Sequence, residues 1–228
     1  MKQIARQDGG TYFAVPGYYH MKFEGQMFMG QWIDPDFQRC YNAVKDQTTM
    51  SIERLWTIYL MAMQCRHVPG VFYECGVFKG GSAKLLAMVL ESSVKSLHLF
   101  DTFAGMPETD PDRDTHNPGD FADTSVELVR KFVGHEGCVD IRPGRIPDTF
   151  VGLEGTPIAF AHIDVDIYQS MKDSIEFIYP RLAKGGVIVF DDYGQPSCPG
   201  AREAIDDYFA SQNSVPLPIG LQAVVFKI

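Results

Sequence analysis

Four aspartates stand in two pairs in the second half of the chain, and each pair follows an apolar run. The segment AHIDVDIYQS contains Asp164 and Asp166, and the segment VIVFDDYGQP contains Asp191 and Asp192. Two carboxylates about 5 Å apart repel by on the order of 3 kcal/mol at an effective dielectric constant of about 20. A shared proton, a basic partner or a bound cation offsets such repulsion. Sites rich in carboxylate oxygens favour Mg²⁺ or Ca²⁺ over zinc, so the four aspartates are candidate metal ligands.

The sequence leaves open which of these aspartates would bind a metal. Side chains alternate along a strand, so Asp164 and Asp166 would share a face if their strand continued. By the same rule, Asp191 and Asp192 would point apart unless their strand had already ended. Asp166 lies nearest to the next expected helix and could cap it instead. His162, inside the apolar run, is expected to be a buried and hydrogen-bonded histidine.

A glycine-rich turn lies further upstream, between an expected strand and an expected helix. The segment ECGVFKGGS, residues 74–82, places Gly76 and Gly80 in an E/D-x-G-x-x-x-G pattern. Glycines let the backbone approach a ligand closely, and a helix N-terminus can receive a carboxylate. The pattern differs from the G-x-G-x-x-G of dinucleotide sites. An ordinary turn between a strand and a helix remains the alternative.

Three further positions belong near the same ligand. Asp101, in LFDTFAGMP, ends the next expected strand, where a carboxylate can accept hydrogen bonds from two ribose hydroxyls. Gly144, in GRIPDTF, follows the third expected strand and would lie near the base of a nucleotide. His116 lies in the polar loop 108–124, which is long enough to predict a lid or a binding loop, with a mobile surface loop as the alternative.

Apolar runs and helical patterns alternate from Ser51 onward. Helices are expected over residues 51–67, 80–93, 124–134, 146–153, 170–186 and 199–210, strands over 71–76, 96–101, 138–144, 157–164 and 187–192, and a hairpin over 215–228. This order predicts an α/β fold with right-handed βαβ units and a parallel sheet covered on both faces. Ligands bind beyond the carboxyl ends of the strands in such sheets. The acids at these ends are Glu74, Asp101, Asp164, Asp166, Asp191 and Asp192.

The bulk composition narrows the class of protein. The 228 residues are 45% hydrophobic and 21% charged, which suits one globular domain with an extra arm. No apolar run reaches transmembrane length, and the N-terminus lacks a signal-peptide core, so a cytosolic location is expected. The net charge of −9 and the absence of a basic run argue against nucleic-acid and membrane partners. Five scattered cysteines without a C-x-x-C pair argue against disulfides and zinc.

The chain is expected to divide near residue 48. Residues 1–47 are rich in aromatic residues, methionine, glycine and proline, and they predict an arm or a lid. The arm could pack on its own domain or cover the site of a neighbour in a homodimer. Residues 48–228 would form the domain that contains the sheet.

Several segments between residues 48 and 210 together are similar to one known family. They are TTMSIERLWTI, VPGVFYECGVFKGGSAKLL, FDTFAGMPETD, HIDVDIYQSMKDSIEFIYPRLAKGGVIVFDDYG and PGAREAIDDYF. They resemble the macrocin-type O-methyltransferases, which are metal-dependent sugar O-methyltransferases of antibiotic biosynthesis. The resemblance implies a Rossmann-like class I methyltransferase fold that binds S-adenosylmethionine (SAM). It also implies a mostly parallel seven-stranded sheet with a C-terminal antiparallel hairpin.

The resemblance also implies roles for particular residues. The residues that would bind the amino-acid part of SAM are Glu74, Gly76, Gly80, Gly81 and Ser82, and Asp101 would bind its ribose. Mg²⁺ would be held by Asp164, Asp191 and Asp192, with Asp166 as the fallback ligand. The mechanism expected from this set is transfer of a methyl group to one of two adjacent hydroxyls, with Asp164 as the general base.

Three other readings of the sequence remain. A catechol-type methyltransferase would use the same metal chemistry on an aromatic diol. A metal-dependent phosphotransferase would use HIDVDIY as a D-x-D motif, although such a motif comes late in this chain and follows a plausible nucleotide loop. A non-catalytic SAM-fold protein would have no need for acids at every strand end.

Overall fold

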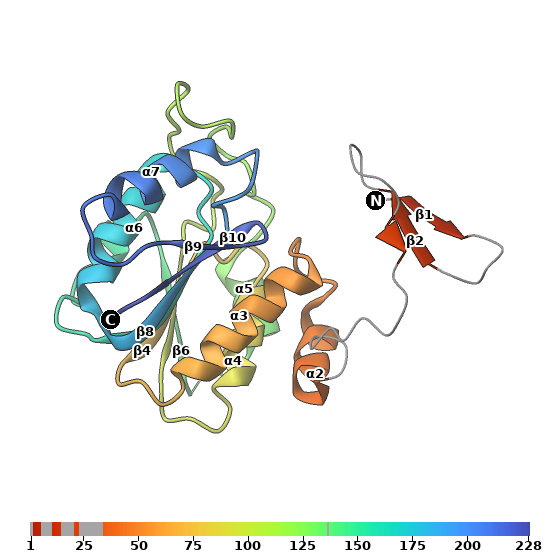
Figure 1. The fold of residues 1–228 in the computed structure, drawn as a ribbon. Coiled ribbons are helices and arrows are strands. Elements are labelled where there is room, and N and C mark those ends of the chain that lie inside the picture. Colours follow the sequence, from red (N-terminus) through yellow and green to blue (C-terminus); the bar gives the residue numbers. More distant parts are fainter. Residues whose placement is uncertain (1, 6–10, 15–20, 23–33, 136) are drawn as a thin grey trace. The chain divides into compact units, whose positions relative to one another are not determined.

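The computed structural model describes residues 2–5, 11–14, 21–22, 34–135 and 137–228 (Figure 1). The chain divides into two compact units, Met1–Asp34 and Pro35–Ile228. The first unit contains an antiparallel sheet of β1 (Lys2–Ala5), β2 (Thr11–Ala14) and β3 (Met21–Lys22). Much of the predicted arm or lid, namely residues 1, 6–10, 15–20 and 23–33, lies outside the described residues. Its role therefore stays a prediction.

A seven-stranded sheet forms the centre of the second unit (Figure 1). The parallel strands are β4 (Val71–Cys75), β5 (Leu97–Asp101), β6 (Val139–Pro143), β7 (Ile158–Ile163) and β8 (Leu182–Phe190). The strands β10 (Gln222–Phe226) and β9 (Leu217–Ile219) form the antiparallel edge beside β8. This arrangement confirms the parallel sheet and its C-terminal hairpin.

The strand order creates a switch point at the centre of the sheet. The order is β6-β5-β4-β7-β8-β10-β9, so the chain builds outward from β4 to β6 and then returns to place β7 on the other side of β4. Connections leave β4 and β7 in opposite directions, which opens a crevice beyond their carboxyl ends. This crevice is where the sequence predicted the site.

Helices cover both faces of the sheet (Figure 1). One face is covered by α3 (Ile52–Cys65), α4 (Gly81–Val89) and α5 (Val126–Val133), and the other by α6 (Tyr168–Arg181) and α7 (Pro199–Phe209). Alternation along β4 separates the two cores, because Phe72 packs in the first and Tyr73 in the second. None of the helices in the described ranges is long and apolar enough to cross a bilayer.

A helix that the sequence did not predict precedes these elements. Helix α2 (Pro35–Val44) buries Phe37, Cys40 and Val44 in the same core as α4. These residues follow helical spacing. The helix was not predicted because the surrounding stretch is rich in aromatic residues and methionine and shows no clear periodicity. Residues from Pro35 onward thus belong to the compact unit that contains the sheet, whereas the sequence placed the start of that domain at residue 48.

One expected helix ends earlier than predicted. The pattern over residues 170–186 predicted a helix that stops at glycines, but α6 ends at Arg181 and β8 begins at Leu182. Leu182 already has an extended backbone, with φ −64° and ψ 122°, and it pairs with Ile158 of β7. Pairing with the neighbouring strand therefore overrides the helical pattern at this end.

Candidate active site

A cavity of about 290 Å³ opens at the carboxyl ends of the parallel strands. It brings together residues that come from the turns after β4, β5, β6, β7 and β8. Eight predicted site residues, counting the fallback ligand Asp166, line it: Gly76, Gly81, Ser82, Asp101, Gly144, Asp164, Asp166 and Asp192. The predicted residues Glu74, Gly80 and Asp191 do not line it, and each has a different surrounding.

The glycine turn after β4 is shaped by close backbone contacts. Gly76 has φ +82°, and a Cβ atom built on it would lie 1.6 Å from the carbonyl oxygen of Asp164. Only glycine therefore fits where the tips of β4 and β7 meet. Gly80, with φ +86°, is the N-cap of α4 and shapes the turn without lining the cavity. The free N–H groups of the first turn of α4 suit an anionic group such as a carboxylate.

Asp101 connects the end of β5 to this turn. Its Oδ2 accepts hydrogen bonds from the backbone N–H groups of Val77 at 2.7 Å and Phe78 at 2.9 Å. Its Oδ1 accepts a third from Phe103 at 2.7 Å. A carboxylate has about four acceptor positions, so one remains for a ligand in the cavity. Asp101 thus holds the glycine turn in addition to facing the predicted ribose position.

Glu74 lies inside the sheet layer instead of at the cavity. Its side chain is fully buried, and its Oε1 lies 2.9 Å from Nδ1 of His162 on the neighbouring strand β7. His162 is itself fully buried. Glu74 lies two residues after Phe72 on β4, so its side chain projects from the face of the sheet that α3 and α4 cover. It positions His162 and has no contact with the cavity.

Three aspartates converge at the tips of β7 and β8. Asp164, Asp166 and Asp192 each offer a carboxylate oxygen, and these oxygens lie within 4.8 Å of one another. Strand β7 ends at Ile163, and the chain then turns through Asp166, whose φ of +59° is unusual for a residue other than glycine. The turn is held by Asp192, whose Oδ2 accepts hydrogen bonds from the N–H groups of Val165 at 3.2 Å and Asp166 at 2.9 Å.

The surroundings of this acidic cluster destabilise the ionised form of each of its three carboxyl groups. Burial and the neighbouring Asp192 raise the pKa of Asp164 to about 7. Burial and Asp164 likewise raise the pKa of Asp166 to about 7, and burial and Asp166 raise the pKa of Asp192 to about 7. A divalent cation among the three oxygens would remove the repulsion, and an all-carboxylate set suits Mg²⁺. The residues present therefore fit the predicted magnesium ion.

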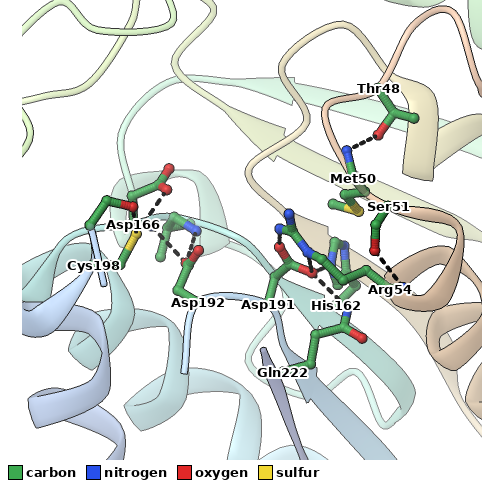
Figure 2. A network of polar contacts seen from close by, with 12 residues as sticks. Thr48, Met50, Ser51, Arg54, His162, Asp166, Asp191, Asp192, Cys198 and Gln222 are labelled. Carbon is green, nitrogen blue, oxygen red and sulfur yellow. Dashed lines mark hydrogen bonds and ion pairs between the residues drawn. The ribbon is translucent and has the colours of Figure 1, made fainter. Parts of the chain in front are cut away.

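Asp191 points away from this cluster (Figure 2). It is fully buried, and its carboxylate forms an ion pair with the guanidinium of Arg54, whose Nε lies 3.1 Å from Oδ1. The amide of Gln222 donates to the same Oδ1 at 2.6 Å, and Nε2 of His162 lies 3.7 Å from it. The structure thus differs from the predicted metal set, because it places Asp191 with Arg54 and brings Asp166 into the cluster. Consecutive side chains at a strand tip project in opposite directions, which explains the exchange.

The sequence did not single out Arg54. Ser51 caps α3, as predicted, by accepting a hydrogen bond from the backbone N–H of Arg54, and this places Arg54 in the first turn of the helix. Arg54 and Asp191 are 137 residues apart, so no local pattern connects them. Only the packing of α3 beside β7 and β8 brings the two side chains together.

His116 and Cys198 also line the cavity. His116 comes from the long loop 108–124, and Cys198 directly precedes α7. The sequence predicted that this loop is a lid or a binding loop, and the structure brings His116 to the wall of the cavity. The backbone N–H of Tyr168 donates to Oδ1 of Asp114 in the loop at 2.8 Å, so the loop caps the N-terminus of α6.

Solved structures with the same arrangement define the class of this protein. The O-methyltransferase NovP superposes with a TM-score of 0.70 and 25% sequence identity, over 79% of this chain and 82% of that chain. The calicheamicin methyltransferase CalS11 superposes with a TM-score of 0.67 and 20% identity, over 90% of this chain and 98% of that chain. The fold is therefore that of a class I SAM-dependent methyltransferase, as predicted.

The family is shown by the sequence comparison. A model of the macrocin-O-methyltransferase (TylF) family matches residues 52–225, and the chain belongs to this family. A tetracenomycin 4'-O-methyltransferase of Streptomyces olivaceus is 32% identical over 62% of this chain and 58% of its own. The mycinamicin III 3''-O-methyltransferase of Micromonospora griseorubida is 30% identical over 62% of this chain and 61% of its own. The matched stretch thus spans about three fifths of the length of these relatives.

Proposed function

We propose that this chain transfers the methyl group of SAM to a hydroxyl group of a sugar-bearing small molecule in natural-product biosynthesis. Family membership supports the reaction, and the names of the relatives, which include a rhamnosyl-tetracenomycin and a mycinamicin, support the acceptor class. The observation that carries the proposal is that one cavity contains two features of different chemistry. A glycine turn suited to the cofactor lies beside a cluster of three carboxylates suited to Mg²⁺.

The cofactor side of the cavity would be formed by the turns after β4, β5 and β6. SAM supplies an activated methyl group when it is bound. The first turn of α4, with Gly81 and Ser82, would bind the carboxylate of its amino-acid part. The remaining acceptor position of Asp101 would take a ribose hydroxyl, and Gly144 would leave room for the base. Gly144 has φ +139°, so a side chain there would also be strained.

The acceptor side would be formed by the acidic cluster. Asp164, Asp166 and Asp192 would hold Mg²⁺, with Asp166 in the position predicted for Asp191. Mg²⁺ held there would supply Lewis-acid chemistry, which lowers the pKa of a nearby hydroxyl. Asp191 would not bind the ion, because its buried ion pair with Arg54 fixes the end of β8 against α3.

Asp164 would accept the proton of the reacting hydroxyl. Within the described part of the chain, its carboxylate accepts no hydrogen bond from a backbone N–H, whereas that of Asp192 accepts two. Asp164 lines the cavity, and no backbone N–H of the described residues takes up its acceptor positions. The hydroxyl oxygen would form its bond to the methyl carbon as the bond between that carbon and the sulfur of SAM breaks. S-adenosylhomocysteine would leave with the electron pair of that bond, and Asp164 would take the hydroxyl proton.

The proposal is tested by a transfer assay with labelled SAM. A panel of sugars and sugar-bearing metabolites with vicinal hydroxyls is offered, together with catechol, in the presence of Mg²⁺ or of a chelator. We expect label on a sugar hydroxyl with Mg²⁺ and at least a hundredfold loss in chelator. Transfer to catechol alone would assign the aromatic alternative, and undiminished transfer in chelator would refute the magnesium site.

A further inference from the structure

A second group of metal-binding side chains lies beside the acidic cluster. His116, Asp166 and Cys198 bring together an imidazole, a carboxylate and a thiol, and all three line the cavity. Figure 2 shows the sulfur of Cys198 directed at the carboxylate of Asp166. Asp166 is the residue that this group shares with the acidic cluster.

The three ligand atoms form a compact triangle. Sγ of Cys198 lies 3.3 Å from Oδ1 of Asp166 and 3.8 Å from Nε2 of His116. The same Nε2 lies 3.8 Å from Oδ1 of Asp166. Around a tetrahedral zinc ion with ordinary bond lengths, neighbouring ligand atoms lie roughly 3.4–3.6 Å apart. Small side-chain movements would therefore place all three atoms on one zinc ion, with a fourth position open to the cavity.

The chemistry of this group differs from that of the acidic cluster. A thiolate and an imidazole favour Zn²⁺ over Mg²⁺, whereas three carboxylates favour Mg²⁺. Nδ1 of His116 lies 3.4 Å from Oδ2 of Asp120, so a carboxylate behind the ring orients Nε2 toward the cavity. Such a carboxylate behind a histidine is typical of zinc sites.

Contacts away from the triangle hold the three ligands in place. The hydroxyl of Thr115 donates to the backbone carbonyl of Ser197, which ties the residue before His116 to the residue before Cys198. Asp114 accepts a hydrogen bond from the N-terminus of α6, as described above. These contacts hold the loop 108–124 beside the start of α7 and the start of α6.

We propose that His116, Asp166 and Cys198 form a zinc-binding site at the wall of the cavity. Cys198 donates its thiol proton toward Asp166 in the structure, and binding would release that proton to solvent. The sequence argued against zinc because it contains no C-x-x-C pair, but here the ligands come from three separate segments. Because Asp166 belongs to both groups, Zn²⁺ would compete with Mg²⁺. This competition rests on the proposed function, whereas zinc binding does not.

Cobalt(II) is the probe that tests the site, because thiolate ligation gives it a charge-transfer absorption in the near ultraviolet. We expect one equivalent of Co²⁺ to produce this absorption in the full chain, and Zn²⁺ to remove it. Cys198→Ser should abolish the absorption, and His116→Ala should weaken Co²⁺ binding at least tenfold. Cys138→Ser, at another cysteine far along the chain from this group, is the control and should retain the full signal.

Two results would overturn the proposal. One is the absence of the absorption in the parent chain, and the other is its full retention in Cys198→Ser. His116→Ala keeps the proposal testable if the buried Cys198 variant does not fold. Because the readout does not involve methyl transfer, a positive cobalt signal in a chain that transfers no methyl group would refute the proposed function and leave the zinc site standing.

Discussion

The two consecutive aspartates that follow β8 have different electrostatic surroundings. Asp191 faces the guanidinium of Arg54 and is neutralised by the protein itself. Asp192 faces Asp166 and Asp164, where no basic side chain of the described residues forms an ion pair with it. A buried carboxylate without a cationic partner is costly, and beside two other carboxylates that cost is offset by a shared proton or a metal.

The ion pair between Arg54 and Asp191 is expected to stabilise the fold. Arg54→Met would leave a buried carboxylate without its cation, which costs about 3–5 kcal/mol in the free energy of unfolding. Urea denaturation measures this loss. The control is Arg39→Met, because Arg39 pairs with Glu91 at the surface, and such pairs contribute about 0–1 kcal/mol. Equal losses in the two variants would contradict the role of Asp191 as a buried anchor.

The acidic cluster gives the metal-free protein a particular pH dependence. The folded-state pKa of about 7 for Asp164 lies above the ordinary value of 3.8, so folding favours the protonated form. The stability from this group is present at low pH and is lost as the pH rises through about 7. We therefore expect the melting temperature in chelator to fall between pH 5 and pH 8.

The variant Asp164→Asn distinguishes the pH dependence that arises from Asp164 from that of the other titratable groups. The variant carries no charge at this position, so its melting temperature in chelator at pH 8 should exceed that of the parent chain. Mg²⁺ at pH 8 should stabilise the parent and have little effect on the variant. Asp112→Asn, at an exposed loop position, should behave like the parent. A parent whose melting temperature neither falls toward pH 8 nor responds to Mg²⁺ would contradict the account.

At the scale of elements, the tips of β4 and β7 meet so closely that glycine is required. Gly76→Ala would place a Cβ atom against the carbonyl of Asp164 and would also strain the positive φ. Gly152→Ala is a matched control, because its φ is +86° but nothing lies within 4 Å of the added atom. We expect a loss of about 1–2 kcal/mol for the control, from backbone strain alone. Gly76→Ala should lose several times more, as measured by urea denaturation, and equal losses would show that the tips do not touch.

The elements themselves were largely predictable, because their signals are local. Apolar runs that end in acids or glycines located β4, β5, β7 and β8, and the strand–helix alternation gave the parallel sheet. Helix α2 was missed because its three buried positions lie next to an aromatic stretch without clear periodicity. The end of α6 was misplaced because pairing of Leu182 with Ile158 is a long-range contact.

The sequence predicted which strand ends contribute residues to the site. It did not predict which side chains contact one another there. That Asp164 and Asp192 share one rim follows from parallel strands. Asp191 pairs with Arg54, and Glu74 lies beside His162. Both contacts depend on packing between segments that are far apart in the sequence. His116 was singled out only because it lies in a long loop, and Cys198 was not singled out at all. That these two side chains meet depends on where the loop lies in the fold.

At the scale of the whole molecule, every described residue of the site belongs to the unit Pro35–Ile228. A chain that begins at residue 35 keeps α2, whereas one that begins at residue 48 loses it and exposes apolar surface of the core on α4. We expect the melting temperature of the shorter chain to be lower by many degrees than that of the longer one. Equal melting temperatures would show that the domain begins at residue 48, as the sequence suggested.

Calorimetric titration of the full chain with SAM shows whether the cavity at the switch point binds this cofactor. We expect one SAM per chain with micromolar affinity, and binding that survives in Asp192→Asn because this residue lies on the acceptor side. The absence of any binding heat, with SAM failing to raise the melting temperature, would contradict the assignment of the glycine turn and Asp101 together.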